Sequence, residues 1–210
     1  MTLAFDAVLL AGGRASRLGG DDKTAFTHAG ATLLDQAIDA ARGARTLVVV
    51  GPRDGVVVPA GAVVAREDPP WSGPVAALAA GLGVVEHPAP WTLVLACDLP
   101  RAPEAVRALL DARLGARPGH DPDLSADGLV AVDDDGRRQP LLALYRTAAV
   151  HTRLTSLRAD GPLEGLSLRR LLAGLGVVEA SVASELCADV DTPEDAARLG
   201  VERRPTRATG

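Results

Sequence analysis

The chain alternates short, uncharged apolar runs with stretches whose apolar residues recur at helical spacing. Uncharged runs of this kind are typical of strands that a parallel sheet buries on both faces. We expect a small strand at 25–30 and further strands at 7–10, 46–51, 62–65, 92–96, 128–132, 139–145 and 177–179.

The stretches between these runs predict helices. Thr32 is a suitable N-cap for the first helix, and Thr192 and Pro193 suit the start of the last one. Helices are expected at 33–43, 74–84, 103–114, 148–158, 167–173 and 193–200. Alternating strands and helices predict an α/β fold, a doubly wound and mostly parallel sheet with helices on both faces. Residues 1–200 should form one domain, and 201–210, which lack an apolar period, should form a disordered tail.

A glycine-rich, cationic segment follows the first apolar run directly. It contains the pairs Gly12-Gly13 and Gly19-Gly20 and the cations Arg14, Arg17 and Lys23. Glycines let backbone N–H groups approach an anion closely, and the cations match the charge of a triphosphate. The segment matches neither the Walker loop nor the dinucleotide fingerprint. The alternative is a surface turn with solvated charges.

Three candidate residues should meet at one edge of the sheet. Gly12, Asp68 and Asp98 each follow the carboxyl end of a predicted strand, where doubly wound sheets bind their ligands. Asp98 emerges from an uncharged run, so it is either a helix cap or a Mg²⁺ ligand. Asp68 is either a nucleotide contact or a turn residue before proline.

Several motifs resemble those of the molybdenum cofactor guanylyltransferase (MobA-like nucleotidyltransferase) family, over most of the chain from Leu10 to Leu199. Leu18 stands where the family usually has Met, Gly20 is an additional glycine, and Ala77 replaces a glycine. The matching segments are Leu10-Ala11-Gly12-Gly13-x-x-Ser16-Arg17-Leu18-Gly19-x-x-x-Lys23, Gly73-Pro74-Val75-Ala76-Ala77, Cys97-Asp98-Leu99-Pro100, Gln139-Pro140-x-x-Ala143-Leu144 and Asp189-Val190-Asp191-Thr192-Pro193-Glu194-Asp195.

The resemblance implies a Rossmann-like nucleotidyltransferase fold and a Mg²⁺-dependent reaction. GMP from GTP would be joined to the phosphate of the molybdopterin cofactor, and pyrophosphate would leave. The resemblance assigns Mg²⁺ to Asp98 and Asp191, although Asp191 could also supply negative charge to the start of the last helix. Arg17 and Lys23 would hold the leaving phosphates. The nucleotide-binding residues that it implies are Leu10, Ala11, Gly12, Gly13, Lys23, Gly51, Asp68 and Asp98.

The identity of the base in the donor nucleotide is the least determined part of this assignment. The family often has Asn at the end of the second strand, where this chain has Gly51. We therefore expect GTP as donor, with a weaker preference over CTP than in a relative that carries the Asn. A sibling enzyme that uses CTP or another phosphorylated acceptor, such as a sugar phosphate or phospholactate, stays open. A nucleotide-binding regulator without turnover is the other alternative.

Composition and charge limit the classes of molecule that this chain is expected to bind. Aromatic residues are only 2% of the chain and the net charge is −5, which argues against a nucleic-acid-binding surface. We expect no signal peptide, because Asp6 interrupts the first apolar run, and no apolar stretch reaches the ~18 residues that a membrane span needs. Cys97 and Cys187 should be buried free thiols. We expect a cytoplasmic enzyme whose partners are GTP and the molybdopterin cofactor, with cofactor carrier or acceptor enzymes as further candidates.

Overall fold

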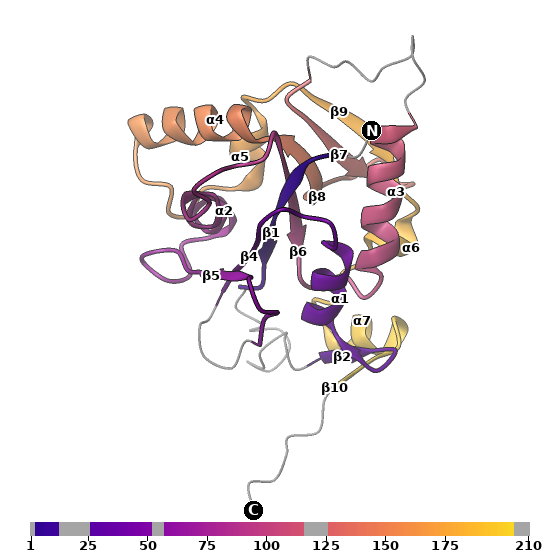
Figure 1. Cartoon of the computed structure of the whole chain (residues 1–210). Helices are drawn as coiled ribbons and strands as arrows, with labels where there is room; N and C mark the ends of the chain where they lie inside the picture. Colours follow the sequence, from indigo (N-terminus) through magenta and orange to yellow (C-terminus); the bar gives the residue numbers. More distant parts are fainter. Residues whose placement is uncertain (1–2, 13–25, 52–56, 116–125, 204–210) are drawn as a thin grey trace, which may run out of the picture.

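A seven-stranded sheet forms the centre of the computed structural model, which describes residues 3–12, 26–51, 57–115 and 126–203 (Figure 1). The strand order is β5-β4-β1-β6-β8-β7-β9, and β8 runs antiparallel to both of its neighbours while the other pairs are parallel. The strands are β1 (Phe5–Leu10), β4 (Leu47–Val50), β5 (Val63–Ala65), β6 (Trp91–Ala96), β7 (Gly128–Val132), β8 (Arg138–Arg146) and β9 (Val177–Ser181). The prediction of a mostly parallel α/β sheet is confirmed.

Helices cover both faces of this sheet, as Figure 1 shows. Alternate side chains of β1 point to opposite faces of the sheet. Ala7 and Leu9 pack toward α1 and α3, and Val8 and Leu10 pack toward α2. One face carries α1 (Leu33–Ala40), α3 (Ala102–Leu114) and α6 (Ser184–Cys187). The other carries α2 (Pro74–Gly83), α4 (Thr147–Asp160) and α5 (Leu168–Leu172). Both faces bury aliphatic side chains, which gives the sheet its doubly wound architecture.

A second, three-stranded sheet has the order β10-β2-β3 and consists of β2 (Phe26–His28), β3 (Ala31–Thr32) and β10 (Val201–Arg203). Helix α7 (Pro193–Arg198) leads into β10 and shares a small core with it, to which Phe26, Ala196 and Val201 contribute. The prediction that a disordered tail begins at residue 201 is therefore wrong for 201–203. These three residues pair with β2, and Val201 is buried. Residues 204–210 lie outside the described ranges.

Two helices begin with the caps that the sequence suggested. The Thr32 hydroxyl accepts from the backbone N–H of Asp35, whose carboxylate accepts from the N–H of Thr32, a reciprocal capping box. Thr192 and Asp195 form the same arrangement at α7, with Pro193 in the first turn. These caps satisfy backbone N–H groups that have no partner within a helix, and so define where each helix starts.

A buried carboxylate fixes the amino-terminal edge of the main sheet. Asp6 in β1 is 1% exposed. Its Oδ1 accepts from the N–H of Thr46 at 3.1 Å, just before β4, and its Oδ2 accepts from the N–H of Ala89 at 2.6 Å, just before β6. Asp6 thus links the starts of three neighbouring strands, at the edge opposite the candidate site.

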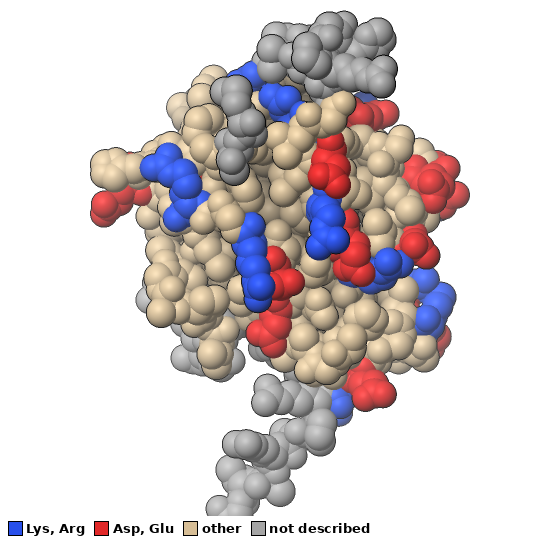
Figure 2. Space-filling view, turned by 45° about the vertical axis from the view of Figure 1, so that its right-hand side comes forward, with Lys and Arg blue, Asp and Glu red and all other residues tan. Residues whose placement is uncertain are grey.

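On the face that Figure 2 presents, the described acidic and basic side chains are interspersed. Some of them pair, as Arg101 Nη1, at the N-cap of α3, and Glu185 Oε1, in α6, do at 3.0 Å. Within the described ranges, none of the helices has the length and apolar character required to cross a bilayer.

Candidate active site

The carboxyl ends of β1, β4, β5 and β6 lie next to one another and carry most of the predicted site residues. Backbone hydrogen bonds continue past the strand ends: Ala11 N–H donates to Val50 O at 2.8 Å, and Gly51 N–H donates to Ala65 O at 3.1 Å. Cys97 N–H likewise donates to Leu10 O at 3.2 Å. These bonds hold the residues that follow each strand in fixed positions, as a site for a phosphorylated ligand requires.

Gly51 lies directly against the backbone that follows β1. A Cβ at this position would be 3.2 Å from the carbonyl carbon and from the Cβ of Ala11, and 3.3 Å from the nitrogen of Gly12. These distances are shorter than ordinary van der Waals contacts. Gly51 therefore allows two strand ends to approach closely, and supplies no side chain to the site.

A cavity of about 330 Å³ opens at this edge. It brings together Gly12 and Asp98, two of the three residues predicted to meet at this edge, and Leu10 and Glu67 line it as well. Most of its surface is apolar, with carboxylates at Glu67 and Asp98. Its lining residues are Leu10, Gly12, Glu67, Trp71, Gly73, Pro74, Ala77, Ala96, Asp98 and Leu141.

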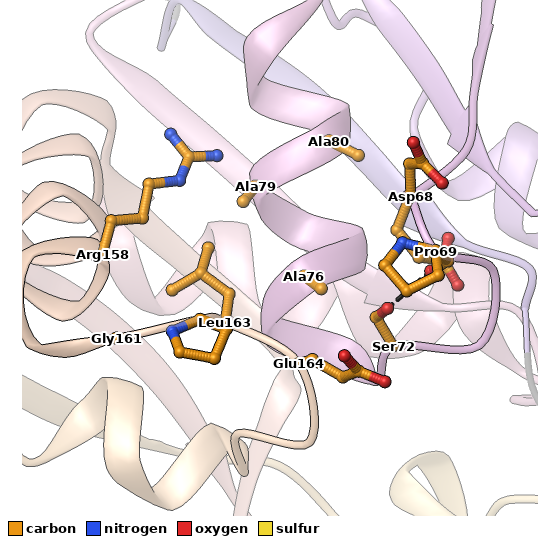
Figure 3. A pocket seen from close by; sticks show the side chains of 12 residues that line it. Asp68, Pro69, Ser72, Ala76, Ala79, Ala80, Arg158, Gly161, Leu163 and Glu164 are labelled. Carbon is orange, nitrogen blue, oxygen red and sulfur yellow. Dashed lines mark hydrogen bonds between the residues drawn. The ribbon is translucent and has the colours of Figure 1, made fainter.

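Asp68 does not line that cavity, contrary to the prediction that it would meet Gly12 and Asp98. It is exposed and lines a neighbouring cavity of about 490 Å³, which Glu67 also borders. Figure 3 shows this neighbouring cavity beside α2, with Asp68 and Arg158 on opposite sides of the helix. Of the consecutive carboxylates Glu67 and Asp68, the structure places the first with Leu10, Gly12 and Asp98.

Three aspartates converge at the end of β6. One carboxylate oxygen each from Asp98, Asp189 and Asp191 lies within 4.8 Å of the others. The backbone N–H of Val190 donates to the carbonyl oxygen of Asp98 at 3.1 Å, which anchors the 189–191 segment beside β6. A set of carboxylate oxygens suits a hard divalent cation such as Mg²⁺, which prefers oxygen ligands.

Asp189 is the member of this group that the sequence reasoning missed. The available signal was the alternation Asp189-Val190-Asp191, which in extended backbone directs the two carboxylates to one side and the valine to the other. Val190 is completely buried, whereas both aspartates are exposed. This alternation could have added Asp189 to the pair Asp98 and Asp191.

A smaller cavity of about 150 Å³ lies on the other side of Asp98. It shares Ala96, Asp98 and Leu141 with the larger cavity, and Asp189 and Gln139 line it as well. Of the three clustered aspartates, Asp98 lines both cavities and Asp189 lines the smaller one. Two bound molecules, one in each cavity, would have their nearest groups at the carboxylates.

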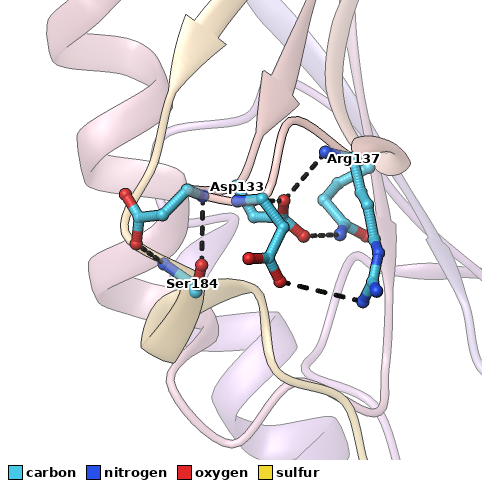
Figure 4. Close-up of polar contacts among 6 residues, drawn as sticks. Asp133, Arg137 and Ser184 are labelled. Carbon is cyan, nitrogen blue, oxygen red and sulfur yellow. Dashed lines mark hydrogen bonds and ion pairs between the residues drawn. The ribbon is translucent and has the colours of Figure 1, made fainter.

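A network of polar contacts surrounds Asp133 at the turn between β7 and β8 (Figure 4), and Gln139 takes part in it. Its Nε2 donates to Asp133 Oδ2 at 3.0 Å, while Asp133 Oδ1 accepts from the N–H of Arg137 at 2.8 Å. Ser184 N–H donates to Asp134 Oδ2 at 2.8 Å, and this bond ties the turn to α6. The network fixes the orientation of the amide in the wall of the smaller cavity.

The two cysteines next to the site are buried free thiols, as predicted. Burial, and secondly the charge of Asp98, raise the pKa of the Cys97 thiol far above neutrality. Burial, followed by the charges of Asp133 and Asp134, raises the pKa of Cys187 to about 11. Since the thiolate is the nucleophile and the metal ligand, both protonated thiols serve as packing groups here.

The predicted residues Gly13, Arg17 and Lys23 lie outside the described ranges, so the cationic part of the site stays a prediction. Ala11 follows β1 and is buried against Val50 and Gly51.

Comparison with known proteins identifies relatives along most of the chain. The family model of the MobA-like NTP transferase domain matches residues 7–181. A molybdenum cofactor guanylyltransferase of Pseudomonas aeruginosa is 30% identical over 192 residues, which cover 89% of this chain and 90% of that protein.

Solved structures share the fold. The crystal structure of Rv0371c from Mycobacterium tuberculosis superposes with a TM-score of 0.70 at 23% identity, covering 95% of this chain and 98% of that one. Molybdopterin-guanine dinucleotide biosynthesis protein A from Archaeoglobus fulgidus gives a TM-score of 0.64 at 21% identity, covering 93% and 96%. At these identities the likeness is one of fold.

Proposed function

Because the chain belongs to the MobA-like NTP transferase family and is a nucleotidyltransferase, we propose that it transfers GMP from GTP to the phosphate of the molybdopterin cofactor with Mg²⁺. The name of the Pseudomonas aeruginosa relative supports this choice of donor and acceptor. The motif matches at 10–23 and 97–100 support it independently.

The observation that carries the proposal is that Asp98, which lines two adjoining cavities, is clustered with Asp189 and Asp191. In the proposed reaction GTP occupies the larger cavity, and the phosphate of the acceptor enters the smaller one. The reacting groups then meet at Asp98, which lines both. Alignment of two anions is the main task of a phosphoryl- or nucleotidyl-transfer site, since the protein itself supplies little covalent chemistry.

In the reaction, an oxygen of the acceptor phosphate attacks the α-phosphorus of GTP. The bond from the α-phosphorus to the oxygen that bridges it to the β-phosphate breaks, and pyrophosphate leaves with that oxygen and its electrons. A Mg²⁺ ion held by Asp98, Asp189 and Asp191 would neutralise charge on the phosphates. We assign to Arg17 and Lys23 the role of binding the leaving phosphates, as the motif suggests.

Two contacts of the described chain would keep the reacting groups aligned. The hydrogen bond from Val190 N–H to the Asp98 carbonyl keeps Asp189 and Asp191 beside Asp98. The close contact of Gly51 with Ala11 and Gly12 fixes the backbone at the entrance of the glycine-rich segment. Neither contact involves a reacting atom, so both act by positioning.

The test supplies the purified protein with molybdopterin, Mg²⁺ and each of the four NTPs separately, and measures pyrophosphate and the dinucleotide product. We expect GTP to be the best donor, and chelation of the metal to stop turnover. Asp98→Asn should lower the rate by about 100-fold, the scale of losing a preorganised electrostatic stabiliser. The matched control is Asp39→Asn, which removes an exposed carboxylate of α1 that pairs with Arg42.

Each arm has an outcome that contradicts part of the proposal. Higher turnover with CTP would overturn the choice of base. Product formation without pyrophosphate, or no reaction with any NTP where the Pseudomonas aeruginosa enzyme reacts, would overturn the proposed function. A rate in Asp98→Asn equal to that of the Asp39 control would refute the metal site.

A further inference from the structure

Trp71 stands out among the described aromatic side chains. It is 46% exposed, although it is a large apolar residue, and it lines the 330 Å³ cavity between β1 and α2. Its φ of +69° lies in the left-handed region, which bulky residues rarely adopt. Such conformations persist where the surroundings enforce them, and they concentrate at ligand-binding segments.

Glu67 holds Trp71 in this conformation. The backbone N–H of Trp71 donates to Glu67 Oε1 at 3.0 Å, and both residues line the same cavity. The Arg66 guanidinium lies 5.9 Å from the centre of the indole ring. The loop 66–71 therefore presents an aromatic surface at the cavity that contains Asp98, with a cation beside it.

The other tryptophan provides a contrast, because the chain contains only two. Trp91 begins β6, at the opposite edge of the sheet, and is 8% exposed. The guanidinium groups of Arg113 and Arg146 lie 5.0 and 4.7 Å from its ring centre. Trp91 is thus a packed residue of the fold, whereas Trp71 is an exposed one.

We propose that Trp71 stacks on the base of the donor nucleotide and that Glu67 positions it. This inference rests on the proposed function, which places the nucleotide in the larger cavity. Aromatic side chains bind bases through their faces, and this stacking tolerates different bases. A two-ring purine covers more of an indole than a one-ring pyrimidine does. Trp71 therefore favours GTP over CTP. Gly51, which has no side chain, does not contribute to this preference.

The experiment uses tryptophan fluorescence of the full chain, with Mg²⁺ and with GTP, CTP or inorganic triphosphate as probes. GTP should quench the emission of the wild type and of Trp91→Phe, in which Trp71 is the remaining tryptophan. It should leave the emission of Trp71→Phe unchanged. Quenching that persists in Trp71→Phe would overturn the stacking.

Calorimetric titration of Trp71→Ala supplies an affinity that needs no fluorophore. We expect the Kd for GTP to rise by about 10-fold and that for CTP by less, consistent with the loss of one stacked base. The Kd for inorganic triphosphate, which has no base, should stay unchanged. Unchanged GTP affinity, or an equal loss for triphosphate, would refute a contact with the base.

Glu67 is tested by rescue with the conservative variant. Glu67→Gln retains a side-chain oxygen that can accept from the Trp71 N–H, so it should keep the GTP-induced quenching. Glu67→Leu should reduce the quenching and raise the Kd for GTP, and equal behaviour of the two variants would refute the positioning role. The proposals are separable, since a wild type that turns over GTP while Trp71→Ala binds it normally contradicts the stacking alone. A wild type that releases no pyrophosphate contradicts the proposed function.

Discussion

Gly51→Ala tests whether the close packing of strand ends controls the site. The added Cβ would lie 3.2 Å from two atoms of Ala11 and 3.3 Å from the nitrogen of Gly12. To restore ordinary contact distances, the 11–12 backbone must move by a few tenths of an ångström. The hydrogen bond from Gly51 N–H to Ala65 O limits movement on the other side.

The expected effects are small on stability and larger on catalysis. Overpacking by one methyl group costs about 1 kcal/mol at the lower end of its range, which corresponds to a Tm lower by about 3 °C for a chain of this size. Misplacement by about 1 Å can cost about 100-fold in rate, so a few tenths should lower kcat/KM for GTP by about 3- to 10-fold. Initial-rate kinetics and calorimetry measure the two effects.

Gly83→Ala is the matched control. The Cβ added at Gly83, the last residue of α2, would meet no atom within 4 Å. Alanine has the better helix propensity, so Tm should stay equal or rise slightly while kcat/KM stays unchanged. If Gly51→Ala lowers Tm and leaves kcat/KM at the control value, the packing does not position the site. If it changes neither quantity, the contact is not tight.

Further predictions concern charge, metal and thiols. Lys23→Ala should raise KM for GTP by about 10-fold and Lys23→Arg should rescue it only in part, because a planar guanidinium replaces a compact ammonium; normal kinetics in Lys23→Ala would make that loop a structural turn. Asp189→Asn should raise the Mg²⁺ concentration needed for half-maximal rate by about 10-fold, and an unchanged metal titration would remove it from the site. Asp6→Asn should destabilise the fold by about 2 kcal/mol in urea denaturation, because one of two backbone donors loses its acceptor; kcat should persist, whereas loss of activity in the folded variant would contradict the structural role. Cys187, with a pKa raised to about 11, should react with iodoacetamide at pH 8 only after unfolding, and fast labelling of the native protein would show that it is accessible.

Much of the fold could be predicted because its signals are local. The uncharged run 7–10 within β1 and the uncharged strand β6 are buried at every position. The caps at Thr32 and Thr192 depend on residues three positions away. The carboxyl-end rule for parallel sheets predicted that Gly12, Asp68 and Asp98 meet at one edge. Gly12 and Asp98 line the same cavity there, whereas Asp68 lines the neighbouring one.

The missed features depend on contacts that are distant in sequence or on backbone detail. Strand β10 has three residues and one buried side chain, so its sequence has no period, and its partner β2 is far away along the chain. The alternation Asp189-Val190-Asp191 places the two aspartates on one side, but their position beside Asp98 depends on the hydrogen bond from Val190 N–H to the Asp98 carbonyl oxygen, which joins distant parts of the sequence. Whether Glu67 or Asp68 faces the cavity depends on the turn that contains Trp71, whose positive φ is unusual for tryptophan.

The pairing of β10 with β2 has a consequence for how the protein is made on the ribosome. The hydroxyl of Thr27 donates to the carbonyl oxygen of Glu202, across 175 positions of sequence. β2, the strand that follows the glycine-rich segment, can pair with β3 early, but the nascent chain must emerge almost to residue 202 before β2 gains β10 as its second neighbour. Asp189 and Asp191 are also translated long after Asp98. A nascent chain that ends before residue 189 can bury much of the sheet yet lacks two of its three clustered carboxylates, so metal-dependent activity should arise late in synthesis.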